Sequence, residues 1–269
     1  MPAPKRIAVA GLGAIGRALA RRLAQGLPGL ALACVAVRDR GKAEAWMREE
    51  GIDCRILTLP TLPDYADLTV EAAPAAVLED ICRPMLSAGK RVMVLSAGAL
   101  LPRPDLIDLA REASGQIIVP TGALLGLDAV AAAAEGNIHS VRMVTRKPPK
   151  GLAGAPHLAE NSISVEGLEE AKLVFRGTAR EAAAGFPANV NVAAALSLAG
   201  IGPDRTMIEI WADPNVSRNC HTIEVDADSA RFTLSIENVP SENPKTGRIT
   251  ALSALAALRK LHAPLRVGT

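Results

Sequence analysis

The sequence predicts an α/β protein of two domains: an N-terminal doubly wound parallel sheet, then a smaller α+β domain with a mostly antiparallel sheet. Three observations support this fold class. The length of 269 residues exceeds that of one typical domain. In the first half, short apolar strands alternate with helices, as in a parallel sheet covered on both faces. In the second half, the last strands follow one another closely, as in an antiparallel meander.

The first half opens with a strand, a glycine loop and a helix. An apolar run at 6–11 leads into GLGAIG at 11–16, and apolar residues then recur at helical spacing. In this context Gly11 permits a tight turn, Gly13 lets the backbone approach a pyrophosphate, and Gly16 lets the helix pack on the strand. The phosphates would lie at the helix N-terminus. This pattern is typical of a Rossmann domain and predicts a dinucleotide site formed by Gly11, Gly13, Ala14, Ile15 and Gly16.

The rest of the first half repeats the alternation of strands and helices. Pro74 suits the first position of a helix, and Gly89 suits its end. Strands are expected at 30–37, 68–73, 91–96 and 116–120, and helices at 41–50, 74–89 and within 102–114.

The carboxyl ends of these strands should hold the cofactor, because ligands bind there in sheets of this kind. Small residues at these ends would let a nicotinamide ring lie close to the backbone. After the second strand, Arg38 suits a 2′-phosphate and Asp39 suits ribose hydroxyls, although arginines in such loops are commonly just solvated charges. We therefore expect use of NAD or NADP. The predicted contacts are Arg38, Asp39, Ala73, Ser96, Ala97 and Ala123.

The second half begins with a helix at about 125–135. The final helix should have Asn243 as its N-cap and Pro244 at its first position. Strands are expected at 140–147, 171–179, 206–214, 220–225 and 230–239, with helices between the second and third of these. The expected division is a dinucleotide-binding domain at 1–122, a substrate and dimerisation domain at 123–243, and a C-terminal helix at 244–269 that packs back on the body.

Composition narrows the possible partners. The net charge of +2 and the absence of a basic block argue against nucleic acid or an anionic membrane surface. The four cysteines form no C-x-x-C pair and have no metal-ligand spacing, so we expect reduced thiols and no metal site. The sequence has no signal region and no apolar run of about 18 residues, which favours a cytoplasmic protein.

One histidine falls inside a predicted strand. The period of two places His221 on the inward face with Ile223 and Val225. A lone histidine on an apolar face is more often a structural residue than a catalytic one. Histidine nevertheless titrates in the range that amine oxidation by hydride transfer requires. The residues alone leave these two interpretations open.

Four segments together resemble the L-aspartate dehydrogenase family, in the right order and over essentially the whole chain. They are VAGLGAIGRALA at the start, TGALLGLDA at 121–129, FPANVNVAAALSLAG at 186–200, and DPNVSRNCHTIEV followed by NPKTGRITALSALAALR. The resemblance implies an NAD(P)-dependent oxidoreductase acting on the CH–NH₂ group of L-aspartate, usually a homodimer. Hydride transfer from the α-carbon would give iminoaspartate, which hydrolyses to oxaloacetate and ammonia or supplies pyridine nucleotide biosynthesis.

The resemblance also implies site residues. His221 is similar to the active-site histidine of the family, and Ala123 and Asn189 to its cofactor-contacting positions. A dicarboxylate substrate needs cationic or backbone donors. The candidates for this task are Asn191, Lys245, Thr246 and Arg248, with Arg146, Lys147 and Lys150 as alternatives.

Two other functions fit the same architecture. One is a related oxidoreductase, such as a homoserine dehydrogenase or a dihydrodipicolinate reductase, because fold alone does not determine chemistry. The other is a non-catalytic NAD(P) sensor. For a dehydrogenase, three roles of His221 stay open: a base for the substrate ammonium, a base for the water that attacks the imine, and an orienting donor. If His221 is a general base, its replacement by alanine should lower turnover by roughly 100-fold or more.

Overall fold

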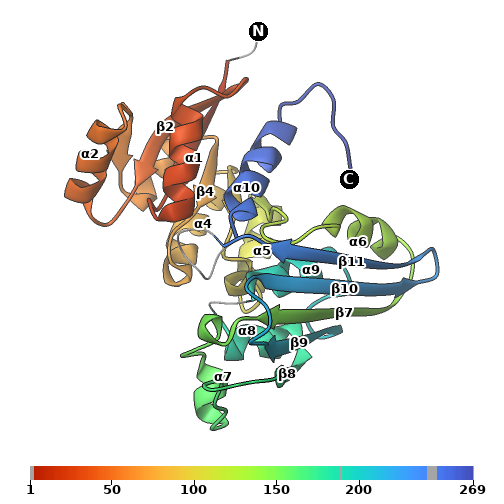
Figure 1. Cartoon of the computed structure of the whole chain (residues 1–269). Coiled ribbons are helices and arrows are strands. Elements are labelled where there is room, and N and C mark those ends of the chain that lie inside the picture. Colours follow the sequence, from red (N-terminus) through yellow and green to blue (C-terminus); the bar gives the residue numbers. More distant parts are fainter. Residues whose placement is uncertain (1–2, 188–189, 241–246, 269) are drawn as a thin grey trace. The chain divides into compact units, whose positions relative to one another are not determined.

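The computed structural model describes residues 3–187, 190–240 and 247–268. The chain forms two compact units (Figure 1). The first comprises Met1–Pro120 and Ala251–Arg266, and the second comprises Thr121–Thr250 and Val267–Thr269. Each unit has its own sheet, and the first unit is therefore made of two separate stretches of sequence.

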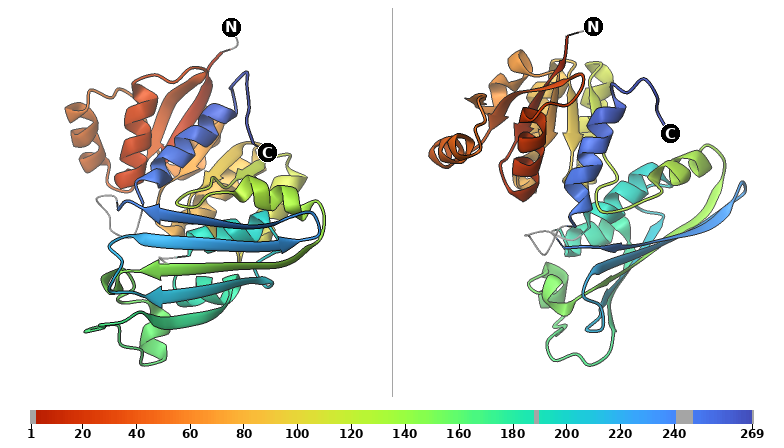
Figure 2. Two further views of the ribbon diagram at one scale, coloured as in Figure 1. Left: turned by 45° about the vertical axis from the view of Figure 1, so that its right-hand side comes forward. Right: turned by 45° about the horizontal axis from the view of Figure 1, so that its top comes forward.

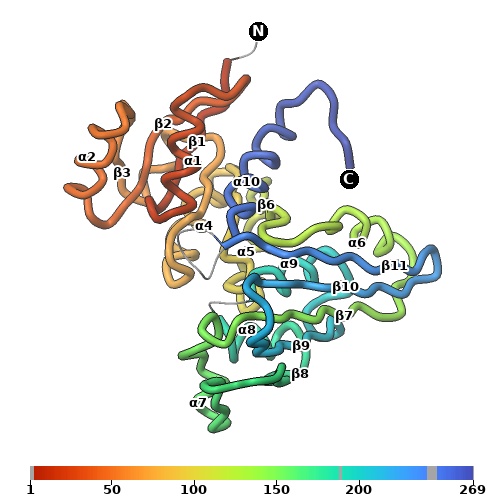
Figure 3. The backbone as a smooth tube through the Cα atoms, viewed as in Figure 1, coloured from red at the N-terminus to blue at the C-terminus, as the bar shows by residue number. Residues whose placement is uncertain are grey.

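The first unit contains a six-stranded sheet in the order β3-β2-β1-β4-β5-β6, in which every pairing is parallel. Its strands are β1 (Lys5–Ala10), β2 (Leu30–Ala36), β3 (Arg55–Leu57), β4 (Leu68–Glu71), β5 (Arg91–Val94) and β6 (Gln116–Ile118). The predicted parallel sheet is confirmed. β3 lies at one edge of the sheet, beside α2 (Figure 3), and was not predicted, because three residues are too few to show a periodic pattern.

Helices cover both faces of this sheet, as a doubly wound fold requires. One apolar cluster joins one face to α1 (Ala14–Ala24), α2 (Arg40–Glu49) and α10 (Ile249–Lys260). A second cluster joins the other face to α3 (Leu62–Tyr65), α4 (Leu78–Ser87) and α5 (Pro104–Glu112). Short 3₁₀ turns complete the unit: η1 (Leu59–Thr61), η2 (Ala75–Val77) and η3 (Ala97–Leu100).

The last helix begins later than the sequence predicts. Asn243 and Pro244 lie outside the described residues. Gly247 pairs with Pro240 in an isolated β-bridge, and α10 begins only at Ile249. A helix cannot run through a residue that is held in a β-bridge, so α10 does not extend back through Gly247.

The second unit contains a five-stranded sheet in the order β11-β10-β7-β9-β8 (Figure 2). Its strands are β7 (Ile138–Lys147), β8 (Lys172–Thr178), β9 (Thr206–Ala212), β10 (Asn219–Ala227) and β11 (Arg231–Asn238). The mostly antiparallel sheet is confirmed, since among the described strands of this sheet only β7 and β9 pair in parallel. The predicted meander is wrong beyond the β10–β11 hairpin, because β7 lies between β9 and β10.

Helices of the second unit complete its core and make the parallel crossover possible. A parallel pair needs a long connection, and the chain between β7 and β9 contains α8 (Ala179–Gly185) and α9 (Asn191–Ala199). The other elements are α6 (Leu127–Ala134), η4 (Pro149–Gly151) and α7 (Pro156–Glu160). His157 lies in α7, with its ring against Phe175 and Phe186. Within the described residues, no helix is both long and apolar enough to cross a membrane.

Candidate nucleotide and substrate sites

The three glycines of the loop that joins β1 to α1 differ in how much room a side chain would have. Gly11 has φ +96°, and a Cβ there would lie 2.5 Å from the carbonyl oxygen of Ala72. A Cβ on Gly16 would lie 1.9 Å from the carbonyl oxygen of Gly11. At Gly13, by contrast, a Cβ would meet no atom within 4 Å. The fold therefore needs glycine at two positions, while the third keeps a space open above the loop.

That open space lies at the N-terminus of α1. Gly13 is the N-cap and has no side chain to satisfy the first amides of the helix, which begins with Ala14 and Ile15. Exposed amides at the positive end of a helix dipole favour a phosphate group. Nε of Arg17 braces the loop by donating to the carbonyl oxygen of Leu12 at 3.1 Å. These features fit a dinucleotide pyrophosphate.

The carboxyl ends of β4 and β5 are tied together by a buried carboxylate. Glu71, fully buried, accepts from the backbone N–H groups of Leu95 and Ser96 at 3.0 and 2.8 Å. The Ser96 hydroxyl donates to the same carboxylate at 3.0 Å. Burial raises the pKa of Glu71 to about 7, against the lowering effect of these donors. Ser96 and Ala97, two predicted cofactor contacts, therefore begin a loop that Glu71 holds, and Ala73 follows β4 directly.

The residues after β2 combine a structural role with the predicted one. Oδ1 of Asp39 accepts from the backbone N–H of Lys42 at 3.0 Å and caps α2. This hydrogen bond lowers the pKa of Asp39. Oδ2 lies 3.3 Å from Nζ of Lys42. Arg38 is exposed. A guanidinium and a carboxylate are thus both present at the end of β2.

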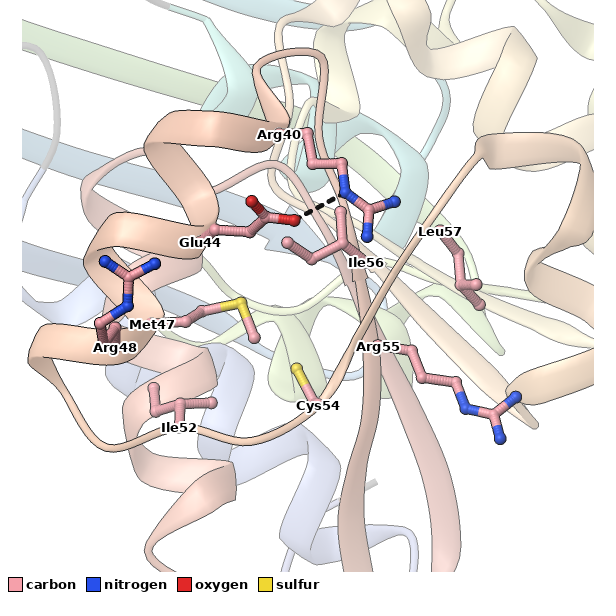
Figure 4. A pocket seen from close by; sticks show the side chains of 9 residues that line it. All are labelled: Arg40, Glu44, Met47, Arg48, Ile52, Cys54, Arg55, Ile56 and Leu57. Atoms are coloured by element: carbon pink, nitrogen blue, oxygen red, sulfur yellow. Dashed lines mark hydrogen bonds and ion pairs between the residues drawn. The ribbon is translucent and has the colours of Figure 1, made fainter.

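An open pocket of about 470 Å³ lies between α2 and β3 (Figure 4). Three arginines line it, and Nε of Arg40 is paired with Glu44 at 2.7 Å. None of the described residues that were predicted to contact the cofactor lines this pocket. Its lining residues are Arg40, Glu44, Met47, Arg48, Ile52, Cys54, Arg55, Ile56 and Leu57.

In the second unit, His221 points into the buried face of the sheet, as its strand period predicts. Its side chain is only 3% exposed, and Ile223 and Val225 are buried on the same face. Nδ1 of His221 lies 3.0 Å from Oγ1 of Thr145. Burial, together with the smaller effect of the nearby Lys147 ammonium, lowers the pKa of His221 to about 3. The imidazole is therefore neutral at neutral pH.

Polar side chains gather at one end of this otherwise apolar face. The register of β7, β10 and β11 aligns His221 with Thr145 and places Lys147 and Asn238 at the same end. All four are buried. Asn238 Nδ2 donates to the carbonyl oxygen of Ala123 at 2.9 Å, which holds that predicted cofactor contact at the same end. Thr145 and Asn238 were not predicted as site residues, because their only signal in the sequence is a polar residue on the inward face of an apolar strand.

The predicted substrate anchors fall in different places. Asn191 is the first residue of α9 and is exposed. Arg248 is exposed, and its backbone N–H donates to the carbonyl oxygen of Val239 at 2.9 Å. Arg146 pairs with Asp213 and stacks on a tryptophan, on the opposite face of β7 from Lys147. Asn189, Lys245 and Thr246 lie outside the described residues. Lys150 is exposed in η4.

The described residues include no group of three or more His, Cys, Asp or Glu side chains arranged to hold a metal ion.

A parallel sheet with an open glycine loop, followed by a unit with a buried neutral histidine, defines a nicotinamide-dependent oxidoreductase of two domains. Residues 11–120 match the NAD-binding domain of homoserine dehydrogenase, and residues 128–261 match the C-terminal domain of aspartate dehydrogenase. The chain is 59% identical to L-aspartate dehydrogenase 3 of Bordetella bronchiseptica, over 98% of this chain and 97% of that one. It is 58% identical to L-aspartate dehydrogenase of Bradyrhizobium diazoefficiens, over 98% and 94%. The chain belongs to the L-aspartate dehydrogenase family.

The fold has a close counterpart among solved structures. The crystal structure of aspartate dehydrogenase from Thermotoga maritima matches with a TM-score of 0.77, over 98% of this chain and 99% of that one. At 22% identity this likeness shows the fold alone.

Proposed function

We propose that this chain oxidises L-aspartate to iminoaspartate with a nicotinamide cofactor, and that the imine then hydrolyses to oxaloacetate and ammonia. The observation that carries the proposal is the identity of 59%, over nearly the whole length of both chains, with a relative named L-aspartate dehydrogenase 3. The proposal is also supported by a buried polar cluster formed by Thr145, Lys147, His221 and Asn238. Burying such side chains costs free energy, and clusters of this kind are typical of functional sites.

The first unit supplies most of the proposed cofactor contacts. The pyrophosphate would lie over Gly13, with Gly11, Ala14, Ile15 and Gly16 shaping the loop around it. Ala73, Ser96, Ala97, Ala123 and Asn189 are proposed contacts of the nicotinamide end. When bound, the oxidised nicotinamide ring accepts the hydride that leaves the substrate α-carbon. Arg38 suits a 2′-phosphate and Asp39 suits ribose hydroxyls, so we propose that both NADP and NAD are used.

The second unit supplies the proposed substrate contacts. A dicarboxylate is best held by cations and N–H donors. Lys147 is 4% exposed and lies close enough to His221 to lower the pKa of its ring, so both face the same polar end of the sheet. Asn191, Lys245, Thr246 and Arg248 are further proposed anchors.

We also propose that the enzyme is a homodimer located in the cytoplasm, which rests on the resemblance to the family. Sedimentation equilibrium of the purified chain tests the dimer, and a mass equal to one chain at micromolar concentration would contradict it.

The initial rate of reduced-nicotinamide absorbance tests the activity. The purified protein is mixed with L-aspartate and either NAD or NADP, with D-aspartate, L-glutamate and L-homoserine as controls. Turnover confined to L-aspartate supports the proposal. L-Homoserine is the sharpest control, since residues 11–120 match a homoserine dehydrogenase domain. Turnover of L-homoserine alone would overturn the substrate, and dinucleotide binding without any turnover would favour the sensor.

A further inference from the structure

The contact between His221 and Thr145 bears on the part that the histidine plays in the proposed reaction. We infer that the Thr145 hydroxyl fixes His221 in the tautomer with its hydrogen on Nε2, so that the ring meets substrate as a hydrogen-bond donor and not as a base. The inference rests on the proposed function for the identity of the substrate, but not for the tautomer itself.

The ring has only one hydrogen to place between its two nitrogens. His221 is 3% exposed, and the Lys147 ammonium beside it is a second reason for the imidazole to stay uncharged. In a neutral imidazole one nitrogen donates and the other accepts. The partner of one nitrogen therefore determines what the other can do.

The partner of Nδ1 is a buried hydroxyl. Thr145 is 3% exposed, and Oγ1 lies 3.0 Å from Nδ1 of His221. Within the described residues, this is the one hydrogen bond recorded for the Thr145 hydroxyl. If Nδ1 carried the hydrogen, the hydroxyl would accept it, and its own hydrogen would be left buried without an acceptor. Because such an unpaired donor is unfavourable, the hydroxyl donates to Nδ1.

The geometry then leaves Nε2 with a hydrogen. An Nε2–H group can donate to a carboxylate oxygen of L-aspartate, next to the ammonium of Lys147. It cannot accept a proton from the substrate ammonium or from water, since Nε2 has no free lone pair. Among the three roles open to His221, that of an orienting donor is the one this hydrogen-bond pattern selects, and Thr145 is its positioning residue.

Nitrogen-15 NMR of protein labelled on its histidine rings tests the tautomer without substrate. The four histidines are resolved by comparison with His221→Asn, which removes one set of signals. The expected spectrum shows a protonated Nε2 and an unprotonated Nδ1 for His221 at neutral pH. A protonated Nδ1 would overturn the inference, whether or not the protein oxidises L-aspartate.

A set of variants tests the positioning role. Thr145→Val removes the hydroxyl at constant shape, so we expect both tautomers in the spectrum and a KM for L-aspartate raised by about ten-fold. Thr145→Ser should restore a single tautomer and most of the affinity. Thr222→Val is the matched control. Thr222 follows His221 in β10, and its hydroxyl lies on the other face of the sheet, where it pairs with the hydroxyl of Ser235. An unchanged tautomer in Thr145→Val would overturn the assignment to Thr145, and the wild-type spectrum decides if that variant fails to fold.

Discussion

The backbone N–H of Ser96 donates to Oε2 of Glu71 over 2.8 Å, while the hydroxyl of Ser96 donates to Oε1 over 3.0 Å. One buried carboxylate thus holds Ser96, which lies between β5 and η3 at the edge of the sheet proposed to bind the cofactor. Because burial raises the pKa of Glu71 to about 7, this anchor titrates near neutral pH.

The stability of the protein should depend on pH through Glu71. A carboxyl whose pKa is higher in the folded state binds its proton more tightly when folded. Its stabilising contribution is complete below the unfolded pKa of 4.5 and is lost as the pH rises through about 7. Glu71→Gln cannot ionise, so its Tm should fall less than that of the wild type between about pH 5 and about pH 8. Equal falls in the two proteins, measured by circular dichroism, would contradict the role of Glu71.

Gly13→Ala and Gly16→Ala should have opposite consequences. A Cβ at Gly13 meets no atom within 4 Å, so the fold should keep its Tm while the dissociation constant for dinucleotide rises by roughly ten-fold. At Gly16 a Cβ would lie 1.9 Å from the Gly11 carbonyl oxygen, so that variant should lose stability. Gly151→Ala, also in open space but in the second unit, is the control. Unaltered dinucleotide affinity in Gly13→Ala would argue against the loop as the pyrophosphate site.

His221→Ala should lower kcat/KM for L-aspartate by about 10- to 100-fold, the range for one hydrogen bond to a charged group. A general base would contribute about 10²- to 10⁴-fold, and its titration would appear in the pH profile. Since the pKa of His221 is about 3, we expect no ionisation of this residue between about pH 5 and about pH 8. Dinucleotide affinity, measured by titration calorimetry, should stay near the wild-type value. A larger loss, with an ionisation near neutrality that disappears in the variant, would point to a base.

Asp39→Asn separates the two tasks of Asp39. Asparagine caps a helix as well as aspartate does, so α2 and the Tm should be preserved. The loss of charge near the ribose should raise the ratio of kcat/KM with NADP to that with NAD by about ten-fold. Arg38→Ala should lower the same ratio. If both variants keep the wild-type ratio, these residues do not determine cofactor preference.

Local pattern predicted most of the first unit. The glycine loop could be recognised because Gly11, Gly13 and Gly16 act within six residues, between a strand and a helix. The position of β7 could not be predicted, because a period of two identifies the inward face of a strand but not the neighbouring strand. That face was predicted correctly for His221, which is buried.

The hydrogen-bond partners of the predicted site residues could not be predicted from local sequence patterns. Thr145 lies 76 residues from His221 and meets it only through the register of β7 and β10. Glu71 contacts Ser96 across two neighbouring strands. Both hydrogen bonds depend on the order of the strands in the sheet, and the spacing of residues along the chain does not reveal that order.

The last helix of the chain completes the first core. Ala254, Leu255 and Leu258 of α10 belong to the same apolar cluster as Ile7 and Val9 of β1. During synthesis on a ribosome, β1 therefore emerges long before the helix that covers it, and the whole second unit is made in between. The first unit can close only after residues 251–266 have been made, so a nascent chain stalled before residue 251 would display apolar surface to chaperones.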